Sequence, residues 1–327
     1  MDASTVPYLR DQLLDRRARL EGAVARKLDT REVTRLLGEI DAALGRIEAG
    51  SYGRCETCHD PIESDRLMAD PLTRFCLDHL TPSDQRALEQ DLALAARVQR
   101  GLLPKADVRF DGWDLAYHYE AAGPVSGDYC DVVPGPGSTG DHYFLIGDVS
   151  GHGVAAAMLM SHLSAVLRTL IALKLPLTQI VERASRVFCE STLPSHYATL
   201  VCGRAERGGQ VEFCNAGHPP PLLVRRDRIE TVVATGLPLG LFCTSQFASC
   251  TVHLDPRDVL LLYTDGLTDA VNPTGDMFGV DRVCALARER VGVDAKTMVA
   301  TYAGELNAFR RGRALADDVT VLALRRD

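Results

Sequence analysis

The chain has 327 residues, of which 46% are hydrophobic and 24% are charged, and its formal net charge is −8. This length exceeds one typical hydrophobic core and predicts about two domains. The acidic balance argues against nonspecific binding to nucleic acid or to an acidic membrane surface, and it favours a protein or small-molecule partner.

Neither a signal peptide nor a membrane span is expected. The amino terminus, "MDASTVPYLRDQ", has acidic residues early and no apolar core. The longest apolar region, "AAAMLMSHLSAVLRTLIALKLPL", is interrupted by His162, Arg168 and Lys174. We therefore expect a cytoplasmic protein.

The first fifty residues repeat apolar positions at helical spacing, from Leu9 to Ile47. The segment "DTRE" interrupts this apolar repeat, and its Asp29 can cap a second helix with Glu32 reaching back. Gly50 can end that second helix. These signals predict a helical hairpin.

A further helix is predicted in "TPSDQRALEQDLALAARVQRGLLP", with Thr81 as its cap, Pro82 in its first turn and Pro104 at its end. One of its faces can pack on its own domain or form a short coiled coil, and we favour a homodimer. The apolar residues of that face are Leu88, Leu92, Ala95 and Leu102.

From Gly112 onward, short apolar strands alternate with Gly and Pro. Helical stretches are expected around 155–173, 176–191 and 282–310. Many antiparallel strands with a few long helices indicate an α+β sandwich.

Asp148 follows the buried strand predicted at Tyr143–Ile146, and the small residues of Gly147–Gly153 follow as a turn. Aspartate also starts turns and caps helices, so this position alone leaves both interpretations open. Asp128 in "SGDYCD", Asp265 in "LLLYTDG" and the pair in "LADDVTVLAL" likewise adjoin strand ends. Carboxylates gathered at one end of a sandwich repel each other unless cations neutralise them, and Mg²⁺ or Mn²⁺ suits oxygen ligands.

The motifs "SGDYCD", "IGDVSGHG", "CNAGHPPPLL", "GLPLGLF", "DVLLLYTDGLTDA" and "ADDVTVLAL", in this order, resemble the bacterial branch of the metal-dependent protein serine/threonine phosphatases, the sporulation and stress-response enzymes related to type 2C. The resemblance covers about Gly101–Arg326. It implies an αββα sandwich that hydrolyses phosphoserine or phosphothreonine with a water activated by two Mn²⁺ or Mg²⁺ ions. It further implies a phosphoprotein substrate, specifically a small anti-sigma-factor antagonist.

The same resemblance assigns the residues of the site. Asp148 is expected to bridge the two metals, the backbone carbonyl of Val149 to be a ligand, and Asp128 to hold one metal, which makes Asp128 and Asp148 the catalytic pair. The second metal is assigned to Asp265 and Asp317. Asp318 and Thr320 are expected to support the start of the last strand, and the supporting role of Asp131 stays open. His152 is expected to be a turn residue, with proton donation or phosphate contact as the alternative. His218 is expected to have a structural role.

The cysteines fall into two groups. Cys55 and Cys58 form C-x-x-C, and Cys76 with His79 repeats that two-residue gap after a knuckle-length loop, a pattern typical of tetrahedral Zn²⁺ ligands. The alternative is buried cysteines beside a surface histidine. The other cysteines are expected to be small buried residues or surface thiols: Cys130, Cys189, Cys202, Cys214, Cys243, Cys250 and Cys284.

The hairpin and "IEAGSYGRCETCHDPIESDRLMADPLTRFCLDH" resemble the DksA/TraR-type zinc finger, which normally has cysteine where His79 stands. The whole chain is thus predicted to have a hairpin with one structural Zn²⁺ at 1–80, a linker helix at 81–104 and a phosphatase domain at 105–327. The zinc module is expected to sense a signal or dock a partner. The rival hypothesis is a noncatalytic regulator that uses the phosphatase fold to bind a partner.

Overall fold

A computed structural model describes residues 5–24, 30–80, 82–105, 108–137, 140–151, 153–192 and 196–327. The chain forms two compact units, 1–91 and 92–327, which are described separately. The predicted division into three parts stays a prediction.

The first unit contains the predicted helical hairpin, α1 (Thr5–Val24) and α2 (Thr30–Glu48). The two helices bury Leu9 and Leu13 of α1 against Ile40 and Ala43 of α2. The proposed cap Asp29 lies outside the described residues. A short α3 (Ser64–Ala69) and the 3₁₀ turn η1 (Leu77–His79) follow in the cysteine-rich segment.

The helix α4 (Pro82–Arg100) begins at Pro82, as predicted, while the proposed cap Thr81 is not among the described residues. It ends at Arg100, before the expected Pro104. The cause is local, because the N–H of Gly101 and the N–H of Leu102 donate to carbonyls three residues back, at 3.0 and 2.9 Å, and this 3₁₀ pattern closes the helix.

The second unit is built on two antiparallel sheets. The six-stranded sheet has the order β1-β2-β11-β10-β7-β8, and the five-stranded sheet has the order β3-β4-β5-β6-β9. The strands are β1 (Val108–Phe110), β2 (Trp113–Glu120), β3 (Asp128–Pro134), β4 (His142–Val149), β5 (Ala198–Ala205), β6 (Gln210–Ala216), β7 (Leu222–Val224), β8 (Ile229–Thr231), β9 (Cys250–His253), β10 (Val259–Tyr263) and β11 (Val319–Arg326).

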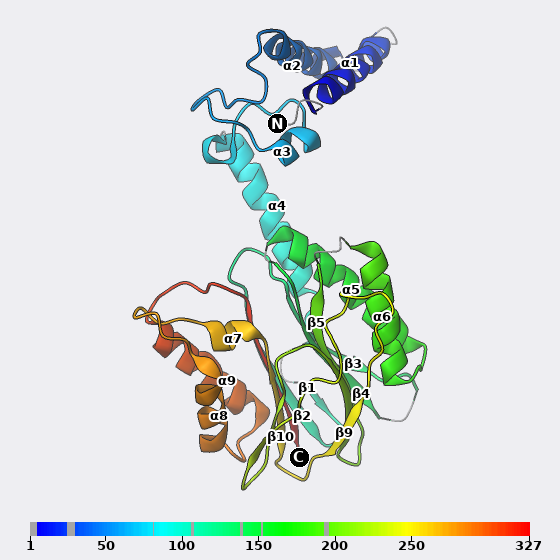
Figure 1. The fold of residues 1–327 in the computed structure, drawn as a ribbon, viewed down its shortest axis with the longest axis vertical. Coiled ribbons are helices and arrows are strands. Elements are labelled where there is room, and N and C mark those ends of the chain that lie inside the picture. Colours follow the sequence, from blue (N-terminus) through cyan, green and yellow to red (C-terminus); the bar gives the residue numbers. More distant parts are fainter. Residues whose placement is uncertain are drawn as a thin grey trace. The chain divides into compact units, whose positions relative to one another are not determined.

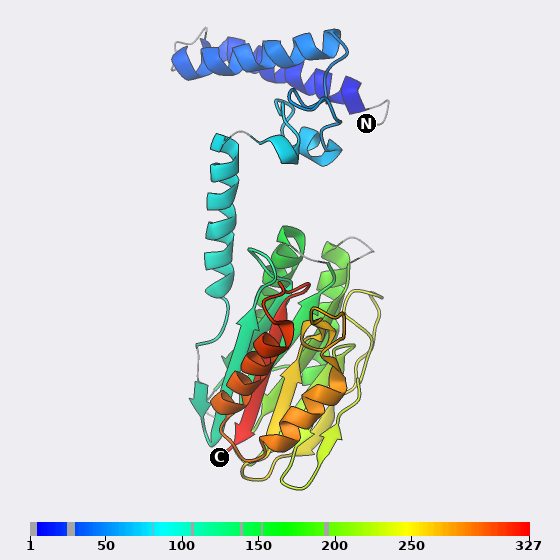
Figure 2. The same ribbon diagram turned by 90° about the vertical axis from the view of Figure 1, so that its left-hand side faces the viewer.

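Helices cover the outer face of each sheet, which makes an αββα sandwich and confirms the predicted fold class (Figures 1 and 2). The helices α5 (Val154–Ala172) and α6 (Leu177–Ser191) pack on the five-stranded sheet, and α8 (Gly279–Glu289) and α9 (Ala295–Arg310) pack on the other. The inner faces of both sheets enclose a third apolar core that includes Phe144, Ile146, Leu262 and Leu322.

The helical stretch predicted at 282–310 is two helices, so that prediction was wrong in its continuity. Gly292 adopts φ +83° between them, and Asp294 caps α9 by accepting a hydrogen bond from the Thr297 N–H at 2.8 Å.

Among the described helices, α5 is the one long and apolar enough to cross a membrane by length and composition. Its residues Met160, Leu163 and Leu167 are buried in the core that it shares with the five-stranded sheet. The same composition is therefore explained by a core helix.

The expectation for the scattered cysteines was wrong at two positions. Cys189 at the end of α6 and Cys243 form a disulfide, with Cα atoms 5.4 Å apart. Their separation of 54 residues hides the pairing from the sequence, because only the fold brings α6 beside this loop. Cys130, Cys202 and Cys214 are buried free thiols, as expected.

Candidate active site and zinc site

Asp128 and Asp148 face each other on neighbouring strands. Asp128 opens β3 and is the register partner of Asp148 near the end of β4. Side chains alternate along a strand, and Cys130 and Ile146 on the same two strands belong to the core between the sheets. Both carboxylates therefore lie on the inner face of the five-stranded sheet.

Gly127 permits the close approach of these two strand ends. A Cβ atom at this position would lie 3.0 Å from the carbonyl oxygen of Val149 and 3.3 Å from Oδ1 of Asp148. A side chain here would occupy the space beside both groups. The Val149 carbonyl and the Asp148 carboxylate thus line one space, as two ligands of one centre must.

Asp128 is held from the opposite sheet by two hydroxyl groups. Thr264 Oγ1 donates to Asp128 Oδ2 at 2.8 Å, and Thr320 Oγ1 donates to the same oxygen at 2.6 Å. These bonds fix the carboxylate and leave Oδ1 to bind another partner. Sequence reasoning gave Thr320 only a role in starting the strand and missed Thr264, whose one signal is its place before Asp265 in "YTDG".

Asp265 and Asp317 come from the six-stranded sheet's side of the site. Asp265 begins α7 (Asp265–Asp269), and Asp317 precedes β11. Gly266 lets these segments touch, because a Cβ there would collide with the carbonyl oxygen of Asp318. Both residues are exposed at the surface, although the carboxylate of Asp265 is partly shielded from water, so they can form the mouth of a site whose floor is Asp128 and Asp148.

Asp318 supports the loop that leads into β3. Its Oδ1 accepts a hydrogen bond from the Ala122 N–H and its Oδ2 accepts one from the Gly127 N–H, both at 2.8 Å. Both oxygens of this buried carboxylate therefore accept hydrogen bonds from backbone N–H groups. The expected role at the start of the last strand therefore extends to the loop that carries Asp128.

The site is electrostatically strained in the absence of cations. Burial, followed by repulsion from Asp265 and Asp317, raises the pKa of Asp148 to about 8. Burial and the nearby Asp148 also raise the pKa of Asp128, and loss of hydration together with Asp317 raises that of Asp265. Divalent cations bound between these carboxylates would stabilise their ionised forms and lower their pKa values.

Asp131 points away from this site. Its carboxylate lies between β3 and α5, where Arg168 donates to both oxygens at 2.6 and 2.8 Å and the Tyr129 hydroxyl donates at 2.6 Å. The supporting role left open for Asp131 thus acts on the far face of β3. The candidate His152 lies outside the described residues.

Gln99 is a residue that sequence reasoning missed. This buried side chain in the last turn of α4 donates to the Ser126 carbonyl at 2.5 Å and accepts from the Ser126 N–H at 3.0 Å. Ser126 Oγ in turn accepts a hydrogen bond from the Asp128 N–H at 3.0 Å. The end of α4 therefore fixes the loop that carries Asp128, and nothing in the helix pattern indicated this contact.

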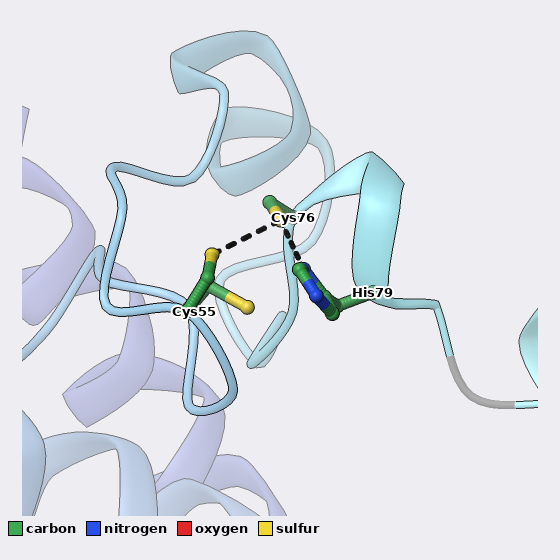
Figure 3. Close-up of side chains that lie close together, drawn as sticks. Cys55, Cys76 and His79 are labelled. Atoms are coloured by element: carbon green, nitrogen blue, oxygen red, sulfur yellow. Dashed lines mark hydrogen bonds between the residues drawn. The ribbon is translucent and has the colours of Figure 1, made fainter.

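The four predicted zinc ligands converge in the first unit. One ligand atom from each of Cys55, Cys58, Cys76 and His79 lies within 4.8 Å of the others. Figure 3 shows the side chains of Cys55, Cys76 and His79 close together. Cys76 Sγ is 3.3 Å from His79 Nδ1 and 3.7 Å from Cys58 Sγ. Such a set can close around one tetrahedral ion.

The two groups of ligands differ in how tightly they gather. Burial acts to raise the pKa of Cys55, but backbone hydrogen bonds, led by those from Cys58 and Cys76, lower it to about 6. At Cys58 a backbone hydrogen bond from Asp60 is outweighed by desolvation and by the neighbouring Cys55 and Cys76, which raise its pKa to about 12. In the described part of the chain, the carboxylates of the second unit are not among the groups of three or more side chains gathered closely enough to hold one ion.

The αββα sandwich with acidic residues at facing strand ends has the fold of PP2C-like phosphatase domains. Residues 138–327, more than half of the chain, match the family described as Stage II sporulation protein E (SpoIIE), and the chain belongs to this family. Residues 50–78 match the prokaryotic dksA/traR C4-type zinc finger. His79 follows that match directly, in place of the fourth cysteine.

Relatives and a solved structure agree with this assignment. The chain is 27% identical over 269 residues to Protein IcfG of Synechocystis sp., covering 72% of this chain but only 42% of IcfG. It is 25% identical to the phosphoserine phosphatase RsbU of Bacillus subtilis, covering 74% and 72% of the two chains. The SiaA-PP2C domain of Pseudomonas aeruginosa shares the fold, with a TM-score of 0.66, 18% identity and coverage of 76% and 100%.

Proposed function

We propose that this protein is a metal-dependent phosphatase that removes phosphate from phosphoserine or phosphothreonine of a regulatory protein. The observation that carries the proposal is that four aspartates gather at one end of the sandwich. Asp128 and Asp148 are register partners, and burial together with the charges of Asp265 and Asp317 raises the pKa of Asp148 to about 8. The SpoIIE family match and the similarity to the phosphoserine phosphatase RsbU also support a phosphatase.

The donor set fits Mn²⁺ or Mg²⁺, because carboxylate and carbonyl oxygens are the ligands of hard divalent ions. Asp128, Asp148 and the Val149 carbonyl would hold the ions on the inner sheet face, and Asp265 and Asp317 would complete the set. Two bound ions supply a water of lowered pKa and neutralise charge on the phosphoryl oxygens.

The protein's own contribution is to hold this constellation rigidly. Thr264 and Thr320 keep Oδ2 of Asp128 occupied, so that its other oxygen has a fixed direction. Asp318 and Gln99 immobilise the loop that leads to Asp128. Preorganised ligands of this kind avoid reorganisation during the reaction.

The decisive experiment is hydrolysis of p-nitrophenyl phosphate by the full chain with Mn²⁺, with Mg²⁺ and with EDTA. We expect turnover that requires either ion and disappears in EDTA. Turnover in rigorously metal-free buffer would refute the metal dependence, whereas no turnover with either ion would refute the phosphatase proposal and favour a noncatalytic regulator.

For the substrate, we propose a small anti-sigma-factor antagonist phosphorylated on serine, on the basis of the resemblance to the stress-response branch and of the relative RsbU. The test compares kcat/KM for such a labelled phosphoprotein with that for phosphocasein. A ratio near one would refute this choice of substrate while leaving the phosphatase proposal intact.

For the first unit we propose one structural Zn²⁺ on Cys55, Cys58, Cys76 and His79, since thiolate and imidazole favour this ion. We further propose a signal-sensing or docking role for this module and a cytoplasmic location. Elemental analysis of the purified protein should find about one zinc per chain.

We also propose that α4 dimerises. Leu88 on this helix is 44% exposed, and Leu92 and Ala95 are half-buried. Sedimentation should find a dimer at micromolar concentration for the natural chain and a monomer for Leu92→Asp, whereas Glu89→Asp should remain a dimer. A natural chain that sediments as a monomer would refute this seam.

A further inference from the structure

His218 is a buried histidine in the turn between β6 and β7, within the motif "NAGHPPP". Its backbone is held by the side chain of Asn215, which is completely buried. The backbone N–H of His218 donates to Asn215 Oδ1 at 2.8 Å, and Asn215 Nδ2 donates to the backbone carbonyl of His218 at 3.1 Å. These two bonds hold the backbone of the turn, and the imidazole ring takes no part in them.

The ring of His218 contacts both sheets. Its Nδ1 is 2.8 Å from Thr199 Oγ1 on β5. Its Nε2 is fully enclosed and has no hydrogen-bond partner among the described residues, and the backbone of Tyr263, at the end of β10 in the other sheet, lies close enough to the ring to affect its pKa. The Thr199 hydroxyl can donate to Nδ1, which would leave the ring proton on Nε2.

Burial lowers the pKa of His218 to about 3, so the ring is neutral at physiological pH. A neutral ring adds no positive charge that would oppose nearby cations. A buried polar ring still costs desolvation free energy that an apolar side chain of the same size would not. This cost, together with an Nε2 that lacks a hydrogen-bond partner, favours a role for the ring beyond packing.

Both contacts of the ring lie next to candidate metal ligands. Thr199 is the register partner of Asp148 across β4 and β5. Tyr263 precedes Thr264, which donates to Asp128, and Asp265 follows directly. One ring thus joins the strand end that carries Asp148 to the strand end that carries Asp265.

We propose that His218 is a positioning residue that sets the distance between Asp148 and Asp265, and thereby the affinity of this site for its two divalent ions. The inference rests on the proposed function, because it assumes that these carboxylates bind Mn²⁺ or Mg²⁺. Residues behind metal ligands commonly change metal affinity by about 10- to 100-fold when they are replaced.

The test measures Mn²⁺ binding to the full chain by titration calorimetry, and the Mn²⁺ concentration for half-maximal hydrolysis of p-nitrophenyl phosphate. The variants are His218→Phe, which keeps a planar ring without polar atoms, Thr199→Val, which removes only the hydroxyl, and Thr199→Ser, which retains it. His142→Phe is the matched control, since His142 is a half-buried histidine at the opposite end of β4.

We expect His218→Phe and Thr199→Val to weaken Mn²⁺ binding about 10-fold or more, with Thr199→Ser and His142→Phe within about twofold of the natural chain. A ring that only stabilises the fold would lower the melting temperature of His218→Phe and leave the Mn²⁺ affinity of the folded protein unchanged, and this result would overturn the inference. If His218→Phe does not fold, the comparison of Thr199→Val with Thr199→Ser is the test. Equal Mn²⁺ affinity of these two variants would also overturn the inference. Failure of the phosphatase proposal would be seen separately, as Mn²⁺ binding by the natural chain without turnover.

Discussion

The two candidate metal sites of this protein are assembled in opposite ways. The four ligands of the finger come from one segment between residues 55 and 79, and they lie within 4.8 Å of one another. The aspartates of the second unit come from positions between 128 and 317, on two sheets and the segments beside them. We therefore expect the first site to depend on its metal for its local fold, whereas the second stands on a sandwich with large apolar cores.

This difference predicts how the sites respond to metal removal. The finger has a small core that includes Ile62 and Leu67, so loss of the ion should loosen the segment itself. The carboxylate site stands at the end of a sandwich with three extensive apolar cores, so loss of its ions should abolish activity without unfolding. The following experiments test this contrast, from the largest expected effect to the smallest.

Asp148→Asn should have the largest effect on hydrolysis. A ligand shared by two ions serves both, and we expect kcat to fall on the order of 1000-fold, about 4 kcal/mol of transition-state stabilisation. Asp265→Asn and Asp317→Asn at the exposed mouth should lose less and should recover part of their activity at high Mn²⁺. Asp227→Asn, an exposed aspartate with the same change of charge, is the control. Equal losses in all three ligand variants at saturating Mn²⁺ would contradict the bridging role.

Cys55→Ser should release the zinc and leave the catalytic site intact. We expect faster hydrogen exchange through residues 51–80, while Mn²⁺-dependent hydrolysis of p-nitrophenyl phosphate stays within about twofold, because the two units have separate cores. Cys284→Ser in the second unit is the matched control and should retain zinc. His79→Cys should also retain zinc, since it restores the ligand of the C4-type finger. A natural chain with no zinc and reactive Cys55, Cys58 and Cys76 thiols would refute the site.

The same contrast explains how much the sequence revealed. Local spacing was sufficient for the finger, because four ligands of one ion in one loop must recur at short intervals, and the structure brings all four together. An α+β sandwich was also predictable, because "YFLIGD" and "VTVLALRR" have strand patterns that become β4 and β11. The αββα order of its layers was implied by the resemblance to the phosphatase family. The metal-ligand roles of the four aspartates remain predictions.

The unpredicted features all depend on contacts between distant segments. Thr264 reaches Asp128 across the sandwich, and a threonine before an aspartate has no distinctive pattern in the sequence. The Cys189–Cys243 disulfide likewise joins segments 54 residues apart. Such pairings are properties of the folded sheets, so strand patterns could indicate the elements but not which side chains meet between them.

The pH dependence of stability should differ between the metal-free and the metal-loaded protein. In the folded metal-free chain the pKa of Asp148 is about 8, far above its ordinary value of 3.8. Between these two values the folded state binds more protons than the unfolded chain, so the free energy of unfolding decreases as pH rises through this window. In EDTA the melting temperature should therefore fall from about pH 5 to about pH 8, and Mn²⁺ should reduce this slope. The slope should also shrink in Asp148→Asn, and an unchanged slope there would assign it to other groups.

The smallest effect should come from Gln99, where α4 meets the loop of Asp128. Gln99→Ala removes two hydrogen bonds to the backbone of Ser126 and leaves those buried groups unpaired, at a cost of about 1–3 kcal/mol in unfolding free energy. Because Ser126 Oγ accepts the Asp128 N–H, the same change should loosen the loop and lower kcat severalfold, with KM for p-nitrophenyl phosphate nearly unchanged. Gln85→Ala on the same helix is the matched control, since Gln85 is exposed and its hydrogen bond is to Glu89. If both variants lose stability equally and neither changes kcat, the end of α4 supports the fold only and does not position the aspartate.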